Sequence, residues 1–365
     1  MENFKRIAKI IGYAVLGVVI IVLAYLCYVF AAYHRIEDHQ QLEVYSSVSS
    51  AGEVKTYPTM QTGVEYKIVT YNIGFGAYSP DFSFFMDGGE SSWAASEESS
   101  RNLVTGAAQL VSSFKPDFVL MQEIDTDSTR TYHLNQLELV ANELSGYAYT
   151  YALNYDSPFL LYPFNEPHGA SVAGIGTFSK YGITSAERRS LPISTGLTKV
   201  VDLDRCYSVN RVQVSNGKEL VIINVHLTAY GSSPEVREGQ TTMLREEIAK
   251  EYAAGNYVIV GGDFNHNLKS KSDSADTLEW AHCFDRNLLP EHCSFALDGL
   301  STKDFVELPD SCRDSGVPYV EGSTATVTLD GFIITDNIEC VTYTNYYEGF
   351  TYSDHEPVIM TFILK

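Results

Sequence analysis

The residues Tyr257-Val258-Ile259-Val260-Gly261-Gly262-Asp263-Phe264-Asn265 show most clearly how this chain folds. A short apolar run closed by two glycines is typical of a buried strand. The run leads directly into an Asp-x-Asn pair, and alternation along extended backbone points both of these side chains to the same side. The stretch therefore predicts a strand whose end presents a carboxylate and an amide at one rim of a sheet.

The same arrangement recurs along the chain, always as a polar side chain beside a β-rich run. These side chains are Asn72 after 66–71, Glu123 after 117–122, His226 after 220–225, Asp330 within 325–335, and the Asp354-His355 pair just before 357–364. Taken singly, each is more often a cap, a turn residue or a satisfied core group. Their conjunction at strand ends predicts one shared rim.

Helical patterns join some of these strands. Apolar residues recur at helical spacing over 103–114, and Pro116 closes that helix before the strand that leads to Glu123. A second helix is predicted over 234–254, with Gly255 in the position of a C-terminal glycine. The further β-rich runs are too many for a simple doubly wound sheet. We therefore predict an α/β fold of two mixed sheets packed face to face, with helices outside.

The segment 10–33 contains no charged residue. At about 1.5 Å per residue, a helix of this length crosses a hydrocarbon core of about 30 Å, so the segment predicts a transmembrane helix. Lys5, Arg6 and Lys9 precede it. The positive-inside tendency then makes 1–9 the cytoplasmic N-terminus of a single-pass protein of the cell membrane, with its bulk extracellular.

A cleaved signal peptide is the competing interpretation of this segment. It is less favoured because the apolar stretch exceeds the usual length of about 7–15 residues. The polar segment 34–65 is interpreted as a linker, and 66–365 as one catalytic domain. Outside a membrane, disulfides are permitted, and Cys283 with Cys293 is a possible pair.

The net charge of −21 argues against a protein that holds nucleic acid with a broad basic face. A polyanionic substrate would have to be attracted locally, most simply by a bound cation. Asn72 and Glu123 offer amide and carboxylate oxygens, which suit Mg²⁺, Mn²⁺ or Ca²⁺ better than zinc. Asp263 is placed to take a proton from water, and Asn265 to hold a phosphate oxygen.

The conjunction of these motifs over 66–365 resembles the endonuclease/exonuclease/phosphatase superfamily of metal-dependent phosphoester hydrolases. The resemblance implies a four-layered α/β sandwich with its site at one rim of the paired sheets. It implies that Asn72 and Glu123 are metal ligands, with Asp354 a further acidic residue at the metal, and that Mg²⁺ is the cofactor. It also implies that Asp263 orients or deprotonates the attacking water.

The resemblance assigns the remaining residues to the phosphate. Asn265 and His226 would contact it in the transition state, and His355 would lie beside it, held by Asp330. The carboxylate partner that the family gives to one histidine is not evident, and Glu166 is a candidate. Arg205 or Arg211 is a candidate for neutralising phosphate charge, although surface ion pairing is the more ordinary role for either.

Three functions remain open at this point. The first is a membrane-anchored phosphoester hydrolase that acts on a phospholipid headgroup or small phosphoester, with no stable protein partner implied. The second is an extracellular deoxyribonuclease-like endonuclease that acts on nucleic acid, and the third is an inactive phosphate-binding module. The aromatic loop 74–100 is expected to contact substrate or lipid, although such residues more commonly pack on their own domain.

Overall fold

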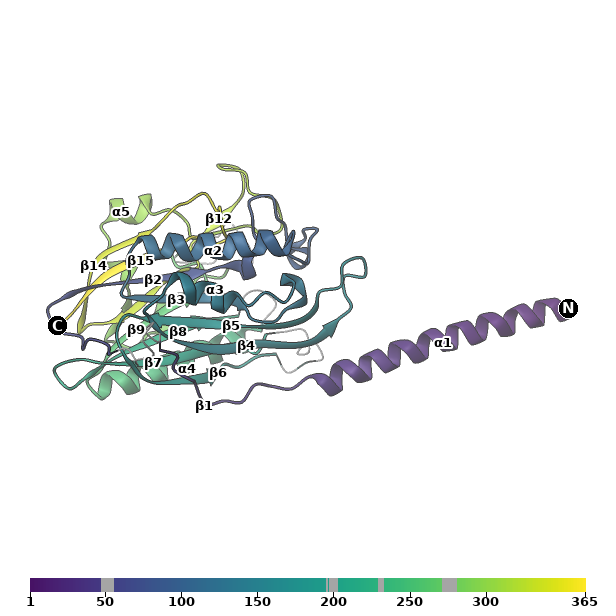
Figure 1. Ribbon diagram of the computed structural model, residues 1–365, viewed down its shortest axis with the longest axis horizontal. Coiled ribbons are helices and arrows are strands. Elements are labelled where there is room, and N and C mark those ends of the chain that lie inside the picture. The colour runs from purple at the N-terminus through teal and green to yellow at the C-terminus, as the bar shows by residue number, and fades with distance from the viewer. Residues whose placement is uncertain (47–55, 195, 197–202, 229–232, 271–280) are drawn as a thin grey trace.

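The computed structural model describes residues 1–46, 56–194, 196, 203–228, 233–270 and 281–365. Two mixed β-sheets pack face to face in it (Figure 1). The strands of the seven-stranded sheet are, in spatial order, β1 (Gln40–Gln41), β6 (Ile183–Ser190), β7 (Cys206–Gln213), β8 (Glu219–His226), β9 (Tyr257–Asp263), β13 (Asp330–Thr335) and β10 (Cys293–Phe295).

The second sheet has six strands among the described residues. They are, in spatial order, β14 (Ile338–Asn345), β15 (Val358–Leu364), β2 (Glu65–Asn72), β3 (Phe118–Asp125), β5 (Gly169–Ser179) and β4 (Ala148–Leu160). A separate short ribbon is formed by β11 (Cys312–Arg313) and β12 (Thr326–Val327). The sheets bury one continuous core between them, to which Ile68 and Leu120 contribute from one side and Ile222 and Ile259 from the other.

Helices cover the outer faces of the sheets. α2 (Glu97–Ser113) and α3 (Gln136–Glu143) pack on the six-stranded sheet, where Val104 and Val140 share a core with Val119. α4 (Pro234–Ala253) packs on the seven-stranded sheet, and α5 (Thr302–Glu307) is a short surface helix. The predicted four-layered α/β sandwich is confirmed.

Two crossovers set the rim on which polar side chains gather. β2 and β3 pair in parallel through α2, and β8 and β9 pair in parallel through α4. Ser96 caps α2 by accepting a hydrogen bond from Ser99 N, and Ser233 caps α4 just before Pro234. Because parallel strands end at the same edge, each crossover brings two strand ends together.

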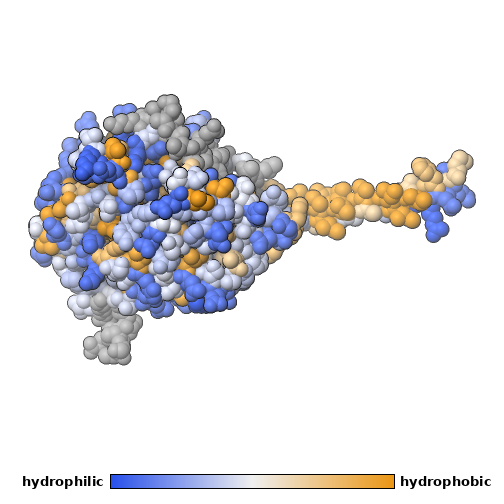
Figure 2. Space-filling view, turned by 90° about the horizontal axis from the view of Figure 1, so that it is seen from above, coloured by the Kyte–Doolittle hydropathy of each residue, from blue (hydrophilic) through white to orange (hydrophobic). Residues whose placement is uncertain are grey.

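α1 (Glu2–Ala32) leaves the domain as a long helix (Figure 1). It is long and apolar enough to cross a membrane, a property that signal sequences near an N-terminus share. Figure 2 shows hydrophobic residues along its length and hydrophilic ones at its N-terminal end. The structure therefore contains the long apolar helix that the sequence predicts over 10–33.

The described parts of the predicted linker 34–65 are not a free tether. β1 pairs with β6, Tyr45 stacks on Tyr149, and Met60 is fully buried. These contacts could not be predicted from the polar composition of the segment. A short edge strand pairs through its backbone groups and does not need a run of apolar side chains. The serine-rich centre of this segment lies outside the described residues. No disulfide joins Cys283 to Cys293 or any other cysteine of the described chain.

Candidate active site

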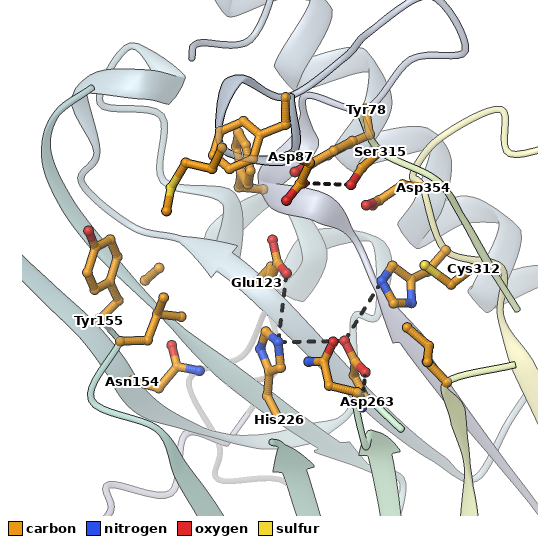
Figure 3. A pocket seen from close by; sticks show the side chains of 18 of the residues that line it. Tyr78, Asp87, Glu123, Asn154, Tyr155, His226, Asp263, Cys312, Ser315 and Asp354 are labelled. Atoms are coloured by element: carbon orange, nitrogen blue, oxygen red, sulfur yellow. Dashed lines mark hydrogen bonds and ion pairs between the residues drawn. The ribbon is translucent and has the colours of Figure 1, made fainter. Parts of the chain in front are cut away.

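A cavity of about 210 Å³ opens at the rim where the strands of both sheets end. Six of the eight predicted site residues line it, namely Glu123, His226, Asp263, Asn265, Asp354 and His355. Figure 3 shows Glu123, His226 and Asp263 turned toward one another, with the Asp354 side chain facing the same cavity. The other two residues, Asn72 and Asp330, lie directly behind and hydrogen-bond to residues of the lining. The structure thus brings all eight together.

Asn72 occupies the last position of β2, as predicted, and is fully buried. Its Nδ2 atom donates to Asp263 Oδ2 at 3.0 Å and to Glu123 Oε1 at 3.1 Å. Its Oδ1 atom accepts from the Gly74 backbone N–H at 3.0 Å. The amide therefore joins the two carboxylates, and ligation of a metal by its oxygen would require the amide to turn.

Glu123 does not end its strand, contrary to the prediction. β3 continues to Asp125, and Glu123 lies at a bulge where the pairing register with β5 shifts between Met121 and Ile124. Glu123 has a positive φ of 58° there. A bulge bends the strand and redirects a side chain, which here turns Glu123 into the cavity. The apolar pattern of the sequence did not reveal it.

Strand register places Asp263 at the centre of the site. His226 is its partner on β8, and Asp330 is its partner on β13. The preceding Gly262 has φ 142°, and a Cβ atom at that position would lie 2.0 Å from Val225 O, so only glycine fits. Asp263 Oδ1 accepts from the Asn265 backbone N–H at 2.8 Å. Burial raises the pKa of Asp263 to about 7.

His355 forms a buried pair with Asp330, whose Oδ2 lies 2.7 Å from His355 Nδ1. The same oxygen accepts from Ser311 Oγ at 2.7 Å. Burial acts to lower the pKa of His355, but the Asp330 carboxylate outweighs it and holds that pKa well above its usual value. The imidazole is therefore positively charged near neutral pH, with Nε2 facing Asp263 Oδ2 at 3.8 Å.

His226 has the opposite character. Its Nε2 lies 3.6 Å from Asp263 Oδ2 and 3.8 Å from Glu123 Oε1. Burial lowers its pKa well below the usual value, and the charges of Arg205 and His355 act in the same direction. A neutral imidazole carries one N–H and donates one hydrogen bond. The site therefore holds one charged and one neutral histidine on either side of Asp263.

The donor set fits a hard divalent cation. Burial and the neighbouring Asp354 carboxylate raise the pKa of Glu123, so a cation between the two acids would relieve their repulsion. Asp263, Asp330 and His355 also form a buried group, with ligand atoms within 4.8 Å of one another, that could bind a metal. Asp330 in that group already accepts from His355 and Ser311, which makes the Glu123 side the better metal position.

Only one of the two arginines that were candidates for neutralising phosphate charge lines the cavity. Arg205 is 7% exposed and lines the cavity, and its Nε and Nη1 have no hydrogen-bond partner among the described residues. Arg211 instead pairs with Glu251 and Glu219, away from the cavity lining. Glu166 accepts from the Ser92 N–H and hydroxyl and does not contact either site histidine.

The cavity also has walls that the sequence did not indicate. They include Asp87, which accepts from Ser315 Oγ at 2.6 Å, and Asn154, Tyr155 and His168 of the β4–β5 region. Asn154 and Tyr155 lie within β4, and Asp87 ends a short 3-10 helix (Phe85–Asp87), so no strand-end pattern marks them. The pairing of β4 with β5 brings Asn154 and Tyr155 to the rim.

The aromatic loop 74–100 packs largely on its own domain, as such residues commonly do. Phe82 and Phe84 are buried and pack in one cluster with Phe75 and Tyr78. Phe84 and Met86 also line the cavity. Met86 is the exposed large hydrophobic side chain of this loop, at 54%. The loop therefore forms one wall of the site.

Several solved structures share the fold of this chain. An endonuclease/exonuclease/phosphatase from Beutenbergia cavernae DSM 12333 matches with TM-score 0.58 and 16% identity, over 82% of this chain and 72% of that one. One from Bacteroides vulgatus matches with TM-score 0.53 and 15% identity, over 83% and 100%. D. rerio TDP2 complexed with single strand DNA product matches with TM-score 0.53 and 14% identity, over 82% and 98%.

No curated protein matches the chain. A family model described as Endonuclease/Exonuclease/phosphatase family matches residues 69–305, which is more than half of the sequence. The matched segment runs from β2 through α5 and includes five of the eight site residues, from Asn72 to Asn265. The chain belongs to the endonuclease/exonuclease/phosphatase family.

Proposed function

We propose that this protein is a divalent-metal-dependent phosphoester hydrolase, anchored in the cell membrane by α1 with its catalytic domain outside. The observation that carries the proposal is the convergence of Glu123, Asp263 and His355 on one cavity. An acid at the metal, a base for water and a charged imidazole for phosphate are the parts that hydrolysis requires. Family membership supports the phosphoester class.

Glu123 and Asp354, with Asn72 after its amide turns, would hold the metal. A Mg²⁺ ion held there would polarise the phosphoryl oxygens and stabilise negative charge on the leaving oxygen. Asp263 serves as the base for the attacking water, and its pKa of about 7 suits a proton acceptor that works near neutral pH. Its hydrogen bonds from Asn72 and Asn265 hold the carboxylate in one orientation.

The phosphate would lie between the two histidines. The charged His355 attracts a phosphoryl oxygen, and Asp330 fixes its ring through Nδ1. The neutral His226 donates one hydrogen bond, and Arg205 supplies a further positive charge inside the cavity. Water attacks phosphorus, the P–O bond to the alcohol breaks, and the alcohol oxygen leaves with a proton.

A nuclease is the second candidate, because the matching D. rerio TDP2 was solved as a complex with single strand DNA product. The net charge of −21 makes a long polyanion a poor partner. Plasmid and single-stranded DNA therefore belong in the test as substrates, with a short soluble phosphodiester beside them. Cleavage of DNA at a rate above that of the small ester would favour the nuclease.

The test is an assay of the full chain in detergent, with and without Mg²⁺, Mn²⁺ or Ca²⁺ after treatment with a chelator. We expect activity only with metal, and losses of about a hundredfold or more in Glu123→Gln, Asp263→Asn and His355→Ala. His292→Ala is the matched control, because His292 also contacts an aspartate, Asp336, but on the surface. Wild-type rates in the three site variants would refute the proposal.

A further inference from the structure

The turn between β4 and β5 exposes an unusual set of aromatic and apolar side chains. Phe159, Leu161, Tyr162 and Phe164 are 39%, 38%, 66% and 83% exposed. We call 159–164 the hairpin tip. No residue of the tip is charged. Exposed apolar groups gathered in one loop indicate a surface that meets another apolar phase.

The hairpin tip is hydrogen-bonded to α1. Tyr25 Oη donates to Phe159 O at 3.3 Å and accepts from the Leu161 N–H at 2.9 Å. Tyr28 Oη accepts from the Phe159 N–H at 3.1 Å. Figure 1 shows the β4–β5 hairpin extending from the side of the domain on which α1 leaves. The tip therefore lies against the last turns of this helix.

The depth of these contacts follows from helix length. About 20 residues cross the hydrocarbon core, so a span that begins at Ile10 ends near Val29. Tyr28 then lies at the outer interface, the depth at which tyrosine and tryptophan are enriched in membrane proteins, and Tyr25 lies about one helical turn deeper. The tip that bonds to them would reach the same interface, with Tyr162 and Phe164 free to enter it.

The domain is held to α1 by more than the tip. Ile36 is buried, and its N–H donates to Asp204 Oδ2 at 3.2 Å. The fully buried Arg188 donates to Glu37 O at 3.0 Å and to Asp204 O at 2.9 Å. These bonds fix the chain directly after α1, so the domain would keep one face toward the bilayer.

An aromatic path leads from the tip to the cavity. The rings of Tyr162 and Phe85 lie 5.9 Å apart, and Phe85 lies 5.0 Å from Phe84 and 5.8 Å from His168. Phe84 and His168 line the cavity. Burial, with the nearby charge of Arg130, lowers the pKa of His168 to about 3, so this imidazole is neutral. The path is uncharged from interface to site.

We propose that the hairpin tip seats in the outer leaflet of the membrane that α1 spans, and that the site hydrolyses phosphodiester headgroups of phospholipids in that bilayer. The proposal rests on the proposed function, whose catalytic residues it uses. Water adds to phosphorus, the P–O bond to the lipid alcohol breaks, and that oxygen takes the proton. The diglyceride or ceramide stays in the leaflet along the aromatic path, and the phosphorylated headgroup leaves to water.

The negative net charge of the protein means that the hairpin tip must bind the membrane through apolar contacts. With a net charge of −21, the protein is not drawn to anionic lipid. Seating of the tip must come from burial of apolar area in the interface. We therefore expect seating to be as deep in pure phosphatidylcholine as in vesicles that contain phosphatidylserine.

The seating test uses the full chain in phosphatidylcholine vesicles with brominated acyl chains, which quench nearby tryptophan. Phe164→Trp adds a reporter at the tip, and Val306→Trp adds one on α5, which Figure 1 shows at the end away from α1. Wild type gives the background of Trp93 and Trp280. We expect at least twofold stronger quenching of the added signal at position 164. Equal quenching at both positions would overturn the seating.

The substrate test compares vesicles of phosphatidylcholine, sphingomyelin and phosphatidylinositol with a short soluble phosphodiester. The Tyr162→Ser, Phe164→Ser double variant should lose about tenfold or more on vesicles and keep its rate on the soluble ester. An equal loss on both substrates, no loss on either, or a wild type that cleaves the soluble ester but no vesicle lipid would overturn the inference. A wild type that is inactive on every substrate would instead refute the proposed function. The quenching experiment would still test the seating of the tip, because it does not depend on activity.

Discussion

Arg205 is a buried cation in an unusual position. Burying a charge without a partner is costly, so proteins retain such groups chiefly where a ligand completes them. Among the described residues, Arg205 Nε and Nη1 have no hydrogen-bond partner, yet the side chain lines the cavity. A phosphate in the cavity would supply the missing acceptors, and a guanidinium binds phosphate through two parallel hydrogen bonds.

We therefore predict opposite consequences for the two arginines near β7. Arg205→Gln should lower kcat/KM by about 10- to 100-fold, the effect of losing a charged hydrogen bond of about 1.5–3 kcal/mol. It should not lower the thermal unfolding midpoint, because it removes a buried charge whose Nε and Nη1 have no hydrogen-bond partner among the described residues. The measurement is kcat/KM on a soluble phosphodiester, with a thermal melt of the same sample.

Arg211→Gln is the matched control. Arg211 donates to Glu251 and Glu219 and does not line the cavity, so this change should lower the unfolding midpoint and leave kcat/KM unchanged. If both variants lost stability and kept kcat/KM, Arg205 would be a structural residue.

At the scale of elements, the sequence predicted which site residues lie at strand ends, but it did not predict the bulge within β3. Asn72, His226 and Asp263 each occupy the last position of a strand, as the apolar runs indicated. Asp330 begins β13, whereas Glu123 does not end its strand, because it lies at a bulge in β3. Hydrophobic pattern reports burial along one strand, whereas a bulge depends on the pairing with its neighbour.

The hairpin tip and the packed linker were missed for a related reason. The sequence from Phe159 to Phe164 is almost entirely apolar, which is typical of buried segments. It does not indicate that these side chains stay exposed. Gln40 and Gln41 give no strand signal, yet they pair with β6. Both features depend on contacts between segments more than 100 residues apart, which periodicity within a short window does not encode.

α4 is fastened to its sheet by ion pairs as well as by apolar contacts. Glu251 is 3% exposed and accepts hydrogen bonds from Arg211 of β7 and from Asn256. Burial acts to raise the pKa of Glu251, but these bonds outweigh it and lower that pKa to about 2. Its stabilisation is thus fully present above the unfolded pKa of about 4.5 and is lost as pH falls toward 2.

The prediction at this scale concerns pH. At pH 7, Arg211→Gln should reduce the free energy of unfolding by about 1.5 kcal/mol relative to wild type. The difference should shrink as pH falls from 4.5 toward 2, because wild-type Glu251 then loses its charge. Denaturant titrations at pH 7 and pH 3 measure it. A difference that stayed constant between the two pH values would show that the pair does not carry this stabilisation.

For the whole molecule, net charge and site charge must be distinguished. A chain with charge −21 attracts divalent cations over its surface, and that attraction is screened by salt. The cavity differs because Glu123 and Asp354 face it together and the pKa of Glu123 is raised. A cation bound there stabilises the native state by mass action, by about 2.7 kcal/mol at 100 times its dissociation constant.

We predict that Mg²⁺ raises the thermal midpoint of the full chain by several degrees over Na⁺ at equal ionic strength, and that chelation reverses the shift. Glu123→Gln should abolish the shift. Without Mg²⁺ this variant should melt no lower than wild type, because the repulsion with Asp354 is gone. Glu98→Gln, on the exposed first turn of α2, should keep the full shift. If Mg²⁺ raised the midpoint of Glu123→Gln as far as that of wild type, the ion would act by binding to the acidic surface. That result would contradict a metal site in the cavity.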